Sequence, residues 1–230
     1  MKITWTVLCL LLAGVAHAGI LIDATRVIYP AGKREVTLAL TSKAADPRLI
    51  QTWIDSGEED TPPEAISAPF IIIPPIFRLN PNQGQSLRII HTGGALPQDR
   101  ESVFWLNVLE IPPKPDARSD HIQLTVRSRL KIFYRPAGLP GSPNEAVKQL
   151  RWRRVNNALE CENPSAFNVS FNHVGLKSAD ASGSDRQSGM CPARGKRTFA
   201  LPVMPVSNRV FFTTIDDHGG LSHHEASLSR

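Results

Sequence analysis

The residues whose spacing is most suggestive of chemistry lie between positions 122 and 136. Apolar side chains occupy every second position from Ile122 to Ile132 except position 128, which is a serine, and the alternate positions include the basic residues Arg127, Arg129 and Lys131. Because side chains alternate between the faces of a β-strand, this pattern predicts one strand of about 13 residues, against an ordinary length of about 5–6. Two interpretations are open. The segment is the last strand of a sandwich with a basic, protected edge, or it is an edge whose apolar row receives a strand of another chain.

Covalent and metal chemistry find little support in the sequence. Gly-x-Ser-x-Gly, His-Glu-x-x-His and glycine-rich nucleotide-binding motifs are missing. His218, His223 and His224 lie near Asp216 and Asp217, but their spacing matches no standard metal site and is more typical of a polar, frayed chain end. We therefore expect a protein that is not an enzyme and that requires no metal and no other cofactor.

Overall composition narrows the possible partners. The 230 residues are 41% hydrophobic, which is enough for packed cores and excludes general disorder. The formal net charge is +5, but the basic residues are scattered and are not interleaved with aromatic ones. Nucleic acid is therefore not an expected partner. The 19 prolines disfavour long helices and favour short strands joined by hard turns.

The first 18 residues have the layout of a secretory signal peptide. Lys2 gives a positive start, residues 3–15 are apolar, and Ala16, His17 and Ala18 form a small-x-small cleavage site. A buried N-terminal strand or helix is the alternative. Cleavage would leave a mature chain that begins at Gly19. No later apolar segment approaches the ~18 residues of a membrane span, so we expect no membrane insertion.

Cysteine usage is consistent with export. Cys9 leaves with the signal peptide, and Cys161 and Cys191 remain as one possible pair. In an oxidising compartment this pair predicts a disulfide bond. Two buried free thiols, or half of a metal site, are the alternatives, although no Cys-x-x-Cys spacing is present.

Short β-rich segments and turn signals alternate from residue 19 to residue 137. The predicted strands cover residues 20–29, 35–41, 49–55, 70–73, 86–91, 103–111 and 122–134. Proline-rich turns separate several of these segments, and proline does not fit the middle of a sheet. About seven strands in ~115 residues is the number expected of an immunoglobulin-like sandwich.

The remainder of the chain predicts a second, less regular β domain. Residues 138–142 form a linker, and Ser142, Pro143 and Glu145 predict one helical turn at the start of the domain that spans residues 143–230. Weaker strands are predicted at residues 159–162, 167–173, 197–202 and 209–215, with an exposed loop at 177–189. The predicted fold class is therefore all-β, with two immunoglobulin-like β-sandwich domains.

Six segments of the first domain carry a resemblance to a known family. They are residues 25–32, 51–55, 74–79, 96–107, 110–113 and 131–136. In this order and spacing they resemble the periplasmic pilus-assembly chaperones, the PapD-like family. The second domain matches more loosely, chiefly at residues 162–164 and around Asp217.

The resemblance implies both a fold and a function. The two domains would meet at an angle with a cleft between them. The protein would be a periplasmic chaperone that binds fimbrial (pilin) subunits by donor-strand complementation and delivers them to an outer-membrane usher. Such subunits lack their own final strand, and here the donor strand would lend them Ile122, Leu124 and Val126.

The same resemblance assigns two charged sites. Arg26 and Lys131 would bind the C-terminal carboxylate of the subunit in the cleft. Glu101, Arg135 and Asp217 match the interdomain charge network of the family, with Asp216 as the alternative to Asp217.

A secreted immunoglobulin-like pilus subunit or adhesin module is the alternative function. A subunit should carry a free N-terminal donor extension and a C-terminal strand that ends near an aromatic residue. Here the segment 25–32 follows the signal peptide almost at once, and the chain ends in Leu228, Ser229 and Arg230. Both observations favour the chaperone.

Overall fold

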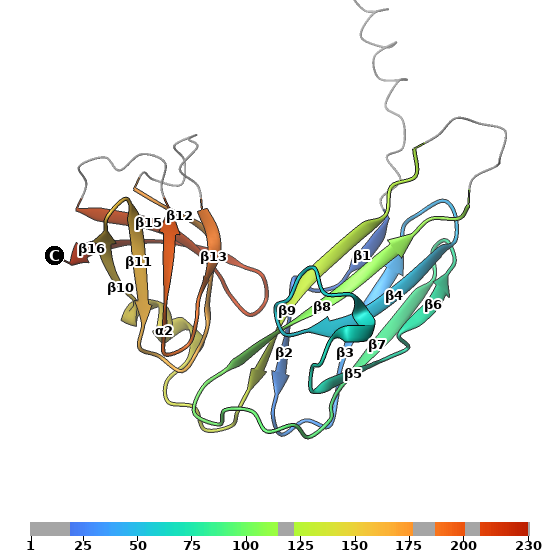
Figure 1. Cartoon of the computed structure of the whole chain (residues 1–230), viewed down its shortest axis with the longest axis horizontal. Helices are drawn as coiled ribbons and strands as arrows, with labels where there is room; N and C mark the ends of the chain where they lie inside the picture. The colour runs from blue at the N-terminus through green and yellow to red at the C-terminus, as the bar shows by residue number, and fades with distance from the viewer. Residues whose placement is uncertain (1–18, 115–121, 177–186, 201–207, 230) are drawn as a thin grey trace, which may run out of the picture.

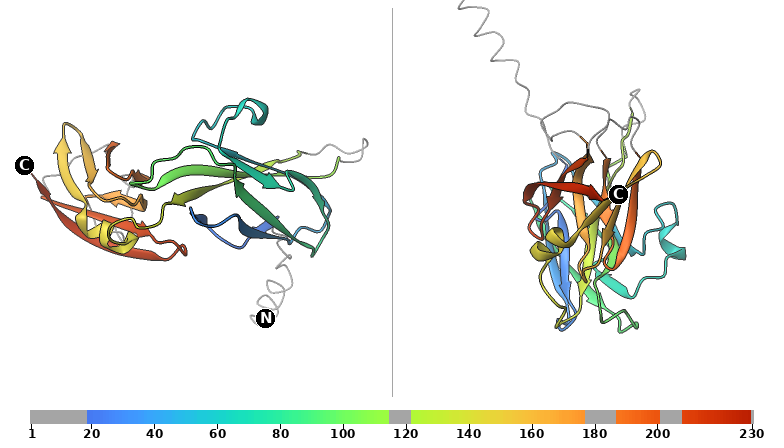
Figure 2. Two further views of the ribbon diagram at one scale, coloured as in Figure 1. Left: turned by 90° about the horizontal axis from the view of Figure 1, so that it is seen from below. Right: turned by 90° about the vertical axis from the view of Figure 1, so that its left-hand side faces the viewer.

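The computed structural model describes residues 19–114, 122–176, 187–200 and 208–229. These residues form two β domains, which appear as separate lobes set at an angle in Figures 1 and 2. The predicted all-β class with two sandwich domains is confirmed. The chain passes from one lobe to the other through residues 136–142 at the lower edge of Figure 1.

Two facing sheets build the first domain. One has the strand order β1-β3-β7-β5 and the other the order β2-β9-β8-β4-β6. The strands and the short 3-10 helix are β1 (Ile20–Ile22), β2 (Arg26–Pro30), β3 (Val36–Ser42), β4 (Arg48–Asp55), η1 (Pro63–Ala65), β5 (Phe70–Ile73), β6 (Ile76–Leu79), β7 (Gly84–His91), β8 (Ser102–Ile111) and β9 (Val126–Arg135). Inward side chains such as Leu40, Ile50, Leu87 and Leu106 are fully buried between the sheets.

The first predicted strand, residues 20–29, is divided between the two sheets. β1 pairs antiparallel with β3, whereas β2 pairs parallel with β9. The chain crosses between the sheets at residues 23–25, after the Asp23 amide donates a hydrogen bond to the Ala39 carbonyl (3.1 Å). As a result, β2 covers only the later part of β9, from Lys131 to Arg135.

The long strand predicted at residues 122–134 begins four residues later than expected. β9 begins at Val126, which lies opposite Glu110 near the end of β8. Pro112 and Pro113 follow β8 directly, and proline cannot continue a ladder. Residues 122–125 therefore have no β8 partner and precede the strand. β6 was not predicted because Pro74 and Pro75 mark a turn, yet a strand at the sheet edge tolerates proline at its start.

The strands of the second domain are hydrogen-bonded into one seven-stranded sheet with the order β13-β12-β15-β16-β10-β11-β14. Its elements are α2 (Pro143–Gln149), β10 (Arg151–Val155), β11 (Ala158–Asn163), β12 (Val169–Gly175), β13 (Gln187–Cys191), β14 (Gly195–Ala200), β15 (Arg209–Ile215) and β16 (Leu221–Ser229). Ser142 caps α2 as predicted, since its Oγ accepts a hydrogen bond from the Glu145 amide (3.3 Å). The helix is longer than the predicted single turn. Trp152 packs with the rings of Phe171, Phe199 and Phe212 in the core.

In this domain the structure corrects the predicted chain end and part of the predicted loop, and it adds two strands that were not predicted. The polar C-terminal end is not frayed: it forms β16, which pairs with β15 from Arg209 to Ile215. β10 and β13 were not predicted, and β13 takes residues 187–189 out of the predicted loop, while residues 177–186 lie outside the described part. The predicted strand at 197–202 corresponds to β14, and its residues 201 and 202 are likewise not described.

The predicted disulfide is not present in this structure. Cys161 and Cys191 are both buried and both carry free thiols. The Cys191 thiol donates a hydrogen bond to the Cys161 carbonyl oxygen (3.3 Å). Burial in the apolar core, with a contribution from the neighbouring Cys191, raises the pKa of the Cys161 thiol. The sequence pairing thus identified two core neighbours, but the structure holds them as free thiols.

Candidate functional site

The early part of β9 presents an unpaired backbone edge. β8 pairs with β9 on one side over its whole length, and β2 pairs on the other side only from Lys131 onward. Within the described residues, no strand covers residues 126–130 on that second side. The three residues predicted to form the donor strand lie at this end, and Ile122, Leu124 and Val126 are 89%, 74% and 54% exposed. Large aliphatic side chains exposed in a row next to an open edge are suited to pair with a strand of another chain.

Arg26 and Lys131 stand where this open edge ends. They are direct partners in the parallel ladder between β2 and β9, so both side chains project from the same face of the sheet. The structure thus brings together the two cations that were predicted to bind one carboxylate, although 105 positions separate them along the chain. Two cations placed side by side are suited to bind one carboxylate by charge-assisted hydrogen bonds.

Arg26 is nearly buried but incompletely paired. It is 8% exposed, and its Nη1 donates a hydrogen bond to the Ile215 carbonyl of the second domain (2.9 Å). Its buried Nε has no hydrogen-bond partner among the described residues. Burial lowers the pKa of Arg26, while the carboxylates of Asp217 and Asp216 act in the opposite direction.

Lys131 is held without a counter-ion. Burial, followed by repulsion from Arg26, lowers the pKa of Lys131 to about 8. Its Nζ lies 5.2 Å from the centre of the Trp105 ring. The described residues provide it with no ion pair, so a cation is retained at a desolvated position. A buried charge of this kind costs free energy unless a partner of opposite charge binds it.

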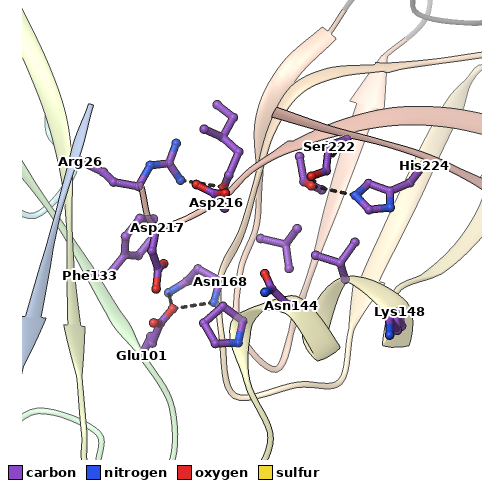
Figure 3. A pocket seen from close by; sticks show the side chains of 15 residues that line it. Arg26, Glu101, Phe133, Asn144, Lys148, Asn168, Asp216, Asp217, Ser222 and His224 are labelled. Atoms are coloured by element: carbon purple, nitrogen blue, oxygen red, sulfur yellow. Dashed lines mark hydrogen bonds between the residues drawn. The ribbon is translucent and has the colours of Figure 1, made fainter. Parts of the chain in front are cut away.

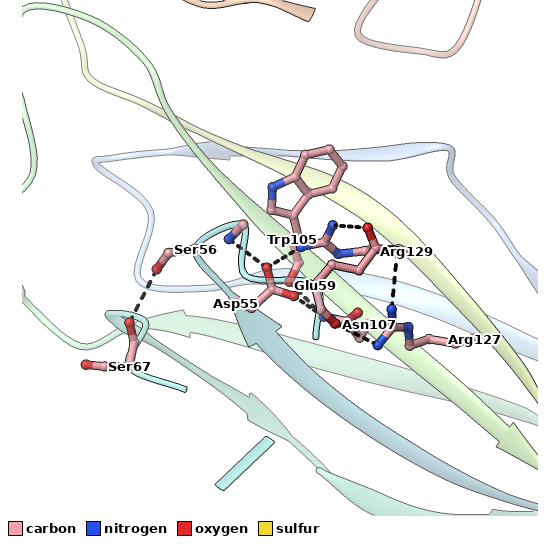
Figure 4. A network of polar contacts seen from close by, with 9 residues as sticks. Asp55, Ser56, Glu59, Ser67, Trp105, Asn107, Arg127 and Arg129 are labelled. Atoms are coloured by element: carbon pink, nitrogen blue, oxygen red, sulfur yellow. Dashed lines mark hydrogen bonds and ion pairs between the residues drawn. The ribbon is translucent and has the colours of Figure 1, made fainter. Parts of the chain in front are cut away.

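Trp105 connects Lys131 to a fixed polar network on the same face of the sheet (Figure 4). Arg129 stacks over the same ring at 4.5 Å and its Nη2 donates to Oδ1 of the buried Asp55 at 2.5 Å. Asp55 is 1% exposed and also accepts hydrogen bonds from the Asn107 side chain (2.6 Å) and the Gly57 amide (2.8 Å). This network holds the ring and Arg129 in place beneath Lys131.

The sequence reasoning assigned no role to Trp105 or Asp55. The signal that could have found Trp105 is its register position, since it lies directly opposite Lys131 on the neighbouring strand. A cross-strand position of this kind follows from the pairing of β8 with β9 and is not visible in either segment alone.

The predicted interdomain charges come together at the other end of β9. Arg135 donates from Nε to Glu101 (2.6 Å) and from both terminal nitrogens to Asp217 (2.8 and 2.9 Å). Glu101 in turn accepts a hydrogen bond from the Asn168 amide of the second domain (2.8 Å). Burial raises the pKa of Glu101, and its bonds to Asn168 and Arg135 oppose that shift.

Asp217, and not the alternative Asp216, makes the contacts to Arg135. Asp216 instead accepts hydrogen bonds from the amides of His218 and Gly220 (2.9 and 2.8 Å), and these bonds lower its pKa. Asp216 thus shapes the turn between β15 and β16 that carries Asp217. The two neighbouring carboxylates have separate structural roles.

A pocket of about 290 Å³ opens between the domains beside Arg26 (Figure 3). Its lining mixes apolar, acidic and basic side chains, including Phe133, Glu101, Lys148, Asp216, Asp217 and His224. Lys131 is not among the lining residues. The pocket therefore reaches Arg26 together with the carboxylates of Glu101, Asp216 and Asp217, but it does not reach Lys131.

The histidines of the C-terminal strand are engaged in the fold. His223 contacts Thr213 and His224 contacts Thr214, each at 2.9 Å. Across the ranges that the structure describes, no group of three His, Cys, Asp or Glu side chains could hold a metal ion. In the same ranges, no helix has the length and apolar character needed to cross a membrane.

Comparison with known families decides the class of the protein. The profile described as "Pili and flagellar-assembly chaperone, PapD N-terminal domain" matches residues 19–140, and that of "Pili assembly chaperone PapD, C-terminal domain" matches residues 145–226. The chain belongs to the PapD family of pilus-assembly chaperones. This membership sets aside the alternative of a pilus subunit or adhesin module.

Individual relatives of the PapD family agree along most of the chain. The chaperone protein FimB/FhaD of Bordetella pertussis is 40% identical over 230 residues, which cover 95% of this chain and 91% of that protein. The crystal structure of the Pseudomonas aeruginosa CupB2 chaperone is similar with a TM-score of 0.74 and 36% identity, covering 90% of this chain and all of that one. A Salmonella enterica SafB chaperone solved in complex with the SafA pilin gives a TM-score of 0.78 at 29% identity, with 94% and 99% covered.

Proposed function

We propose that this PapD-family chaperone binds pilus subunits by donor-strand complementation and anchors each subunit by its C-terminal carboxylate. The observation that carries this proposal is the open edge of β9 over residues 126–130, which ends beside Lys131 and beside Arg26, whose Nε has no hydrogen-bond partner among the described residues. The structurally similar SafB chaperone, which was solved with a pilin, supports it.

The site fixes the direction of the incoming strand. β9 runs from Val126 toward Lys131, and β2 begins at Arg26 opposite Lys131. A strand added to the open edge continues the line of β2 and ends at the two cations. If that end carries the C-terminal carboxylate, the added strand runs parallel to β9. A subunit strand held in this direction is bound at its backbone and at its terminus together.

The apolar row supplies the second half of the interaction. Leu124 and Val126 line one side of a pocket together with Ile20, Ile22 and Ser128, so their side chains share one face. Inserted into a subunit that lacks its last strand, Ile122, Leu124 and Val126 would cover its exposed core. A slip by one residue would turn this row outward, so the carboxylate anchor at Arg26 and Lys131 also fixes the register.

The two faces of the donor segment provide a sharp test with a matched control. We expect Leu124→Glu to abolish co-purification of a subunit co-expressed from the same gene cluster, because a carboxylate would enter an apolar groove. Thr125→Glu places the same charge at the adjacent position, on the other face, and should leave capture intact. Both residues lie outside the folded ladder. Equal capture by the two variants would refute the proposed role of the apolar row.

The proposal includes export and delivery. Residues 1–18 would direct the chain to the periplasm, where its subunit complex is handed to an outer-membrane usher, and the Glu101, Arg135 and Asp217 network would hold the two domains at the required angle. Mass spectrometry of a periplasmic extract tests the first step, since the mature chain should begin at Gly19. Binding of the purified chaperone–subunit complex, and not of free chaperone, to the periplasmic part of the usher tests the second.

A further inference from the structure

Two charged side chains point into the sandwich of the first domain far from the cleft. Glu110 lies directly opposite the fully buried Ile50, so it projects from the inner face of the sheet. Arg48 lies two positions before Ile50 in the same strand and shares that face. The Glu110 side chain is only 14% exposed. A charged side chain at an inward position of a sandwich costs free energy of folding. The groups that contact it therefore indicate its role.

The contacts of Glu110 lead to the beginning of β1. Its Oε1 lies 3.2 Å from the Arg48 Nε, which has no aligned hydrogen bond, and its Oε2 accepts a hydrogen bond from the Ile20 amide (3.2 Å). The main chain of Gly19 lies directly against the same carboxylate. A Cβ at position 19 would stand 2.4 Å from Oε2 and 2.9 Å from Oε1. Only a glycine approaches the carboxylate this closely without displacing it.

We propose that Glu110 is the binding site for the α-ammonium group of the mature N-terminus. This inference rests on the proposed export step, in which the peptide bond between residues 18 and 19 is hydrolysed by a signal peptidase. One water is consumed, residue 18 keeps the new carboxylate, and Gly19 receives an amino group that is protonated at neutral pH. Cleavage thus creates a cation next to an inward-facing carboxylate.

The location connects this N-terminal site to the donor segment. Gly19, Ile20 and Glu110 line a pocket of about 300 Å³ together with Leu124 and Val126. β1 and β9 belong to the two facing sheets of the first domain. An ammonium bound to Glu110 anchors β1 on one wall of this pocket, across from the donor residues. The mature N-terminus would therefore form part of the pocket wall that faces the donor residues Leu124 and Val126.

A double-mutant cycle tests the proposal with the exported, full-length chain. One variant carries a single serine inserted between residues 18 and 19, which moves the ammonium one residue away from Glu110. The second variant is Glu110→Gln, and the third combines both changes. Mass spectrometry verifies each mature N-terminus before thermal unfolding is measured. We expect the insertion to lower the unfolding midpoint by about 3–6 °C in the native background and by less than about 1 °C in the Glu110→Gln background.

Each outcome of the cycle decides for or against the site. An insertion without effect in the native background, or an equal loss in both backgrounds, would overturn it. Gly19→Ala is a second probe, since its methyl group displaces the carboxylate while the ammonium remains at position 19, and it should also lower the midpoint. A chain whose N-terminus is not Gly19 refutes the export step as well, whereas subunit capture is measured separately and can succeed or fail independently.

Discussion

β9 carries two basic residues four positions apart whose surroundings are opposite. Arg135 uses its guanidinium on Glu101 and Asp217, and these bonds join the two domains. Lys131 is desolvated as well, yet the charge that acts on it is another cation, Arg26, and its pKa is lowered to about 8. The charge of Arg135 is paired with two carboxylates of the same chain, whereas that of Lys131 has no ion pair among the described residues.

The difference separates a structural role from a binding role. Arg135 contributes to the native structure through bonds that are already made. Lys131 raises the energy of the unliganded protein, and under the proposed function it would recover that energy on binding the carboxylate of a subunit. Charge and burial alone do not distinguish the two residues, whereas the presence or absence of a bonded carboxylate does. Substitution of Arg135 should therefore lower stability, whereas substitution of Lys131 should lower capture without lowering stability.

Substitution of Arg135 should cause the largest loss of stability. Arg135→Met leaves Glu101, whose side chain is 1% exposed, without its cation. Breaking a buried ion pair in this way costs about 3 kcal/mol of the free energy of unfolding, measured by urea denaturation at pH 7. Burial already raises the pKa of Glu101, so the group becomes neutral more readily as the pH falls. The loss should accordingly be smaller at pH 5.

Arg127→Met is the matched control for this stability effect. Arg127 lies on the same strand and face, but its partner Glu59 is 63% exposed. An exposed pair contributes about 0–1 kcal/mol. Comparable losses for the two arginines would show that the interdomain bonds add nothing beyond surface charge.

Substitution of Lys131 should have the reverse effect. Lys131→Met removes one charge-assisted bond to the carboxylate, and we expect binding of a peptide copied from the last strand of a subunit to weaken about 10- to 100-fold. The free energy of unfolding should not fall, because an unpaired buried cation is removed. The exposed Lys33→Met is the control. A peptide with an amidated C-terminus should bind wild type and Lys131→Met equally, and any remaining difference would contradict the carboxylate anchor.

The sequence was sufficient to predict features that depend on a local pattern of residues. The alternation from Ile122 to Ile132 predicted which side chains of β9 face the core, as the buried Leu130 and Ile132 show, and the Ser142 cap predicted α2. It was insufficient where the outcome depends on which strands meet. The break between β1 and β2 is such a case, since residues 20–29 read as one strand and no local feature states that its halves join different sheets. That break is what leaves the edge of β9 open.

The second domain shows the same limit in another form. β16 reads as a polar tail because its histidines and serines give no apolar row, yet seven residue pairs with β15 fix it in the sheet. Its stability comes from the backbone ladder and from contacts such as His224 with Thr214. The turn before β16 carries Asp217, the member of the charge network for which the sequence also offered Asp216. The position of Asp217 therefore depends on β16.

A smaller effect follows from the pKa of Lys131. A carboxylate binds the ammonium form, and with a pKa of about 8 the protonated fraction falls as the pH rises above that value. Peptide binding should therefore weaken up to about tenfold between pH 7 and pH 9. Lys131→Arg keeps its charge over this range and should bind with a flat profile. A wild-type profile as flat as that of Lys131→Arg would show that Lys131 stays fully charged at pH 9.

The stability of the free chaperone should move in the opposite direction over the same range. The unfolded chain holds the Lys131 proton up to its ordinary pKa of 10.5, whereas the folded chain releases it near 8. Between these values the unfolded state binds more protons, so this group contributes increasing stability as the pH rises. Below pH 8 both states hold the proton, so the difference in unfolding free energy between wild type and Lys131→Met should be constant there and should shrink only as the pH rises from 8 toward 10.5.

The smallest expected effect concerns the support beneath Lys131. Trp105→Leu removes the ring that lies 5.2 Å from the Lys131 Nζ, while the bond between Arg129 and Asp55 remains. A cation–π contact at a partly exposed site contributes about 0.5–1 kcal/mol, so we expect binding of the subunit peptide to weaken about two- to fivefold. Trp53→Leu is the matched control, because Trp53 is half-buried on the same sheet face and lies opposite Asn107 in place of Lys131. Equal weakening by both substitutions would mean that the face is merely destabilised. Weakening by Trp105→Leu alone, and its absence with the amidated peptide, would show that the ring acts on the carboxylate through the orientation of Lys131.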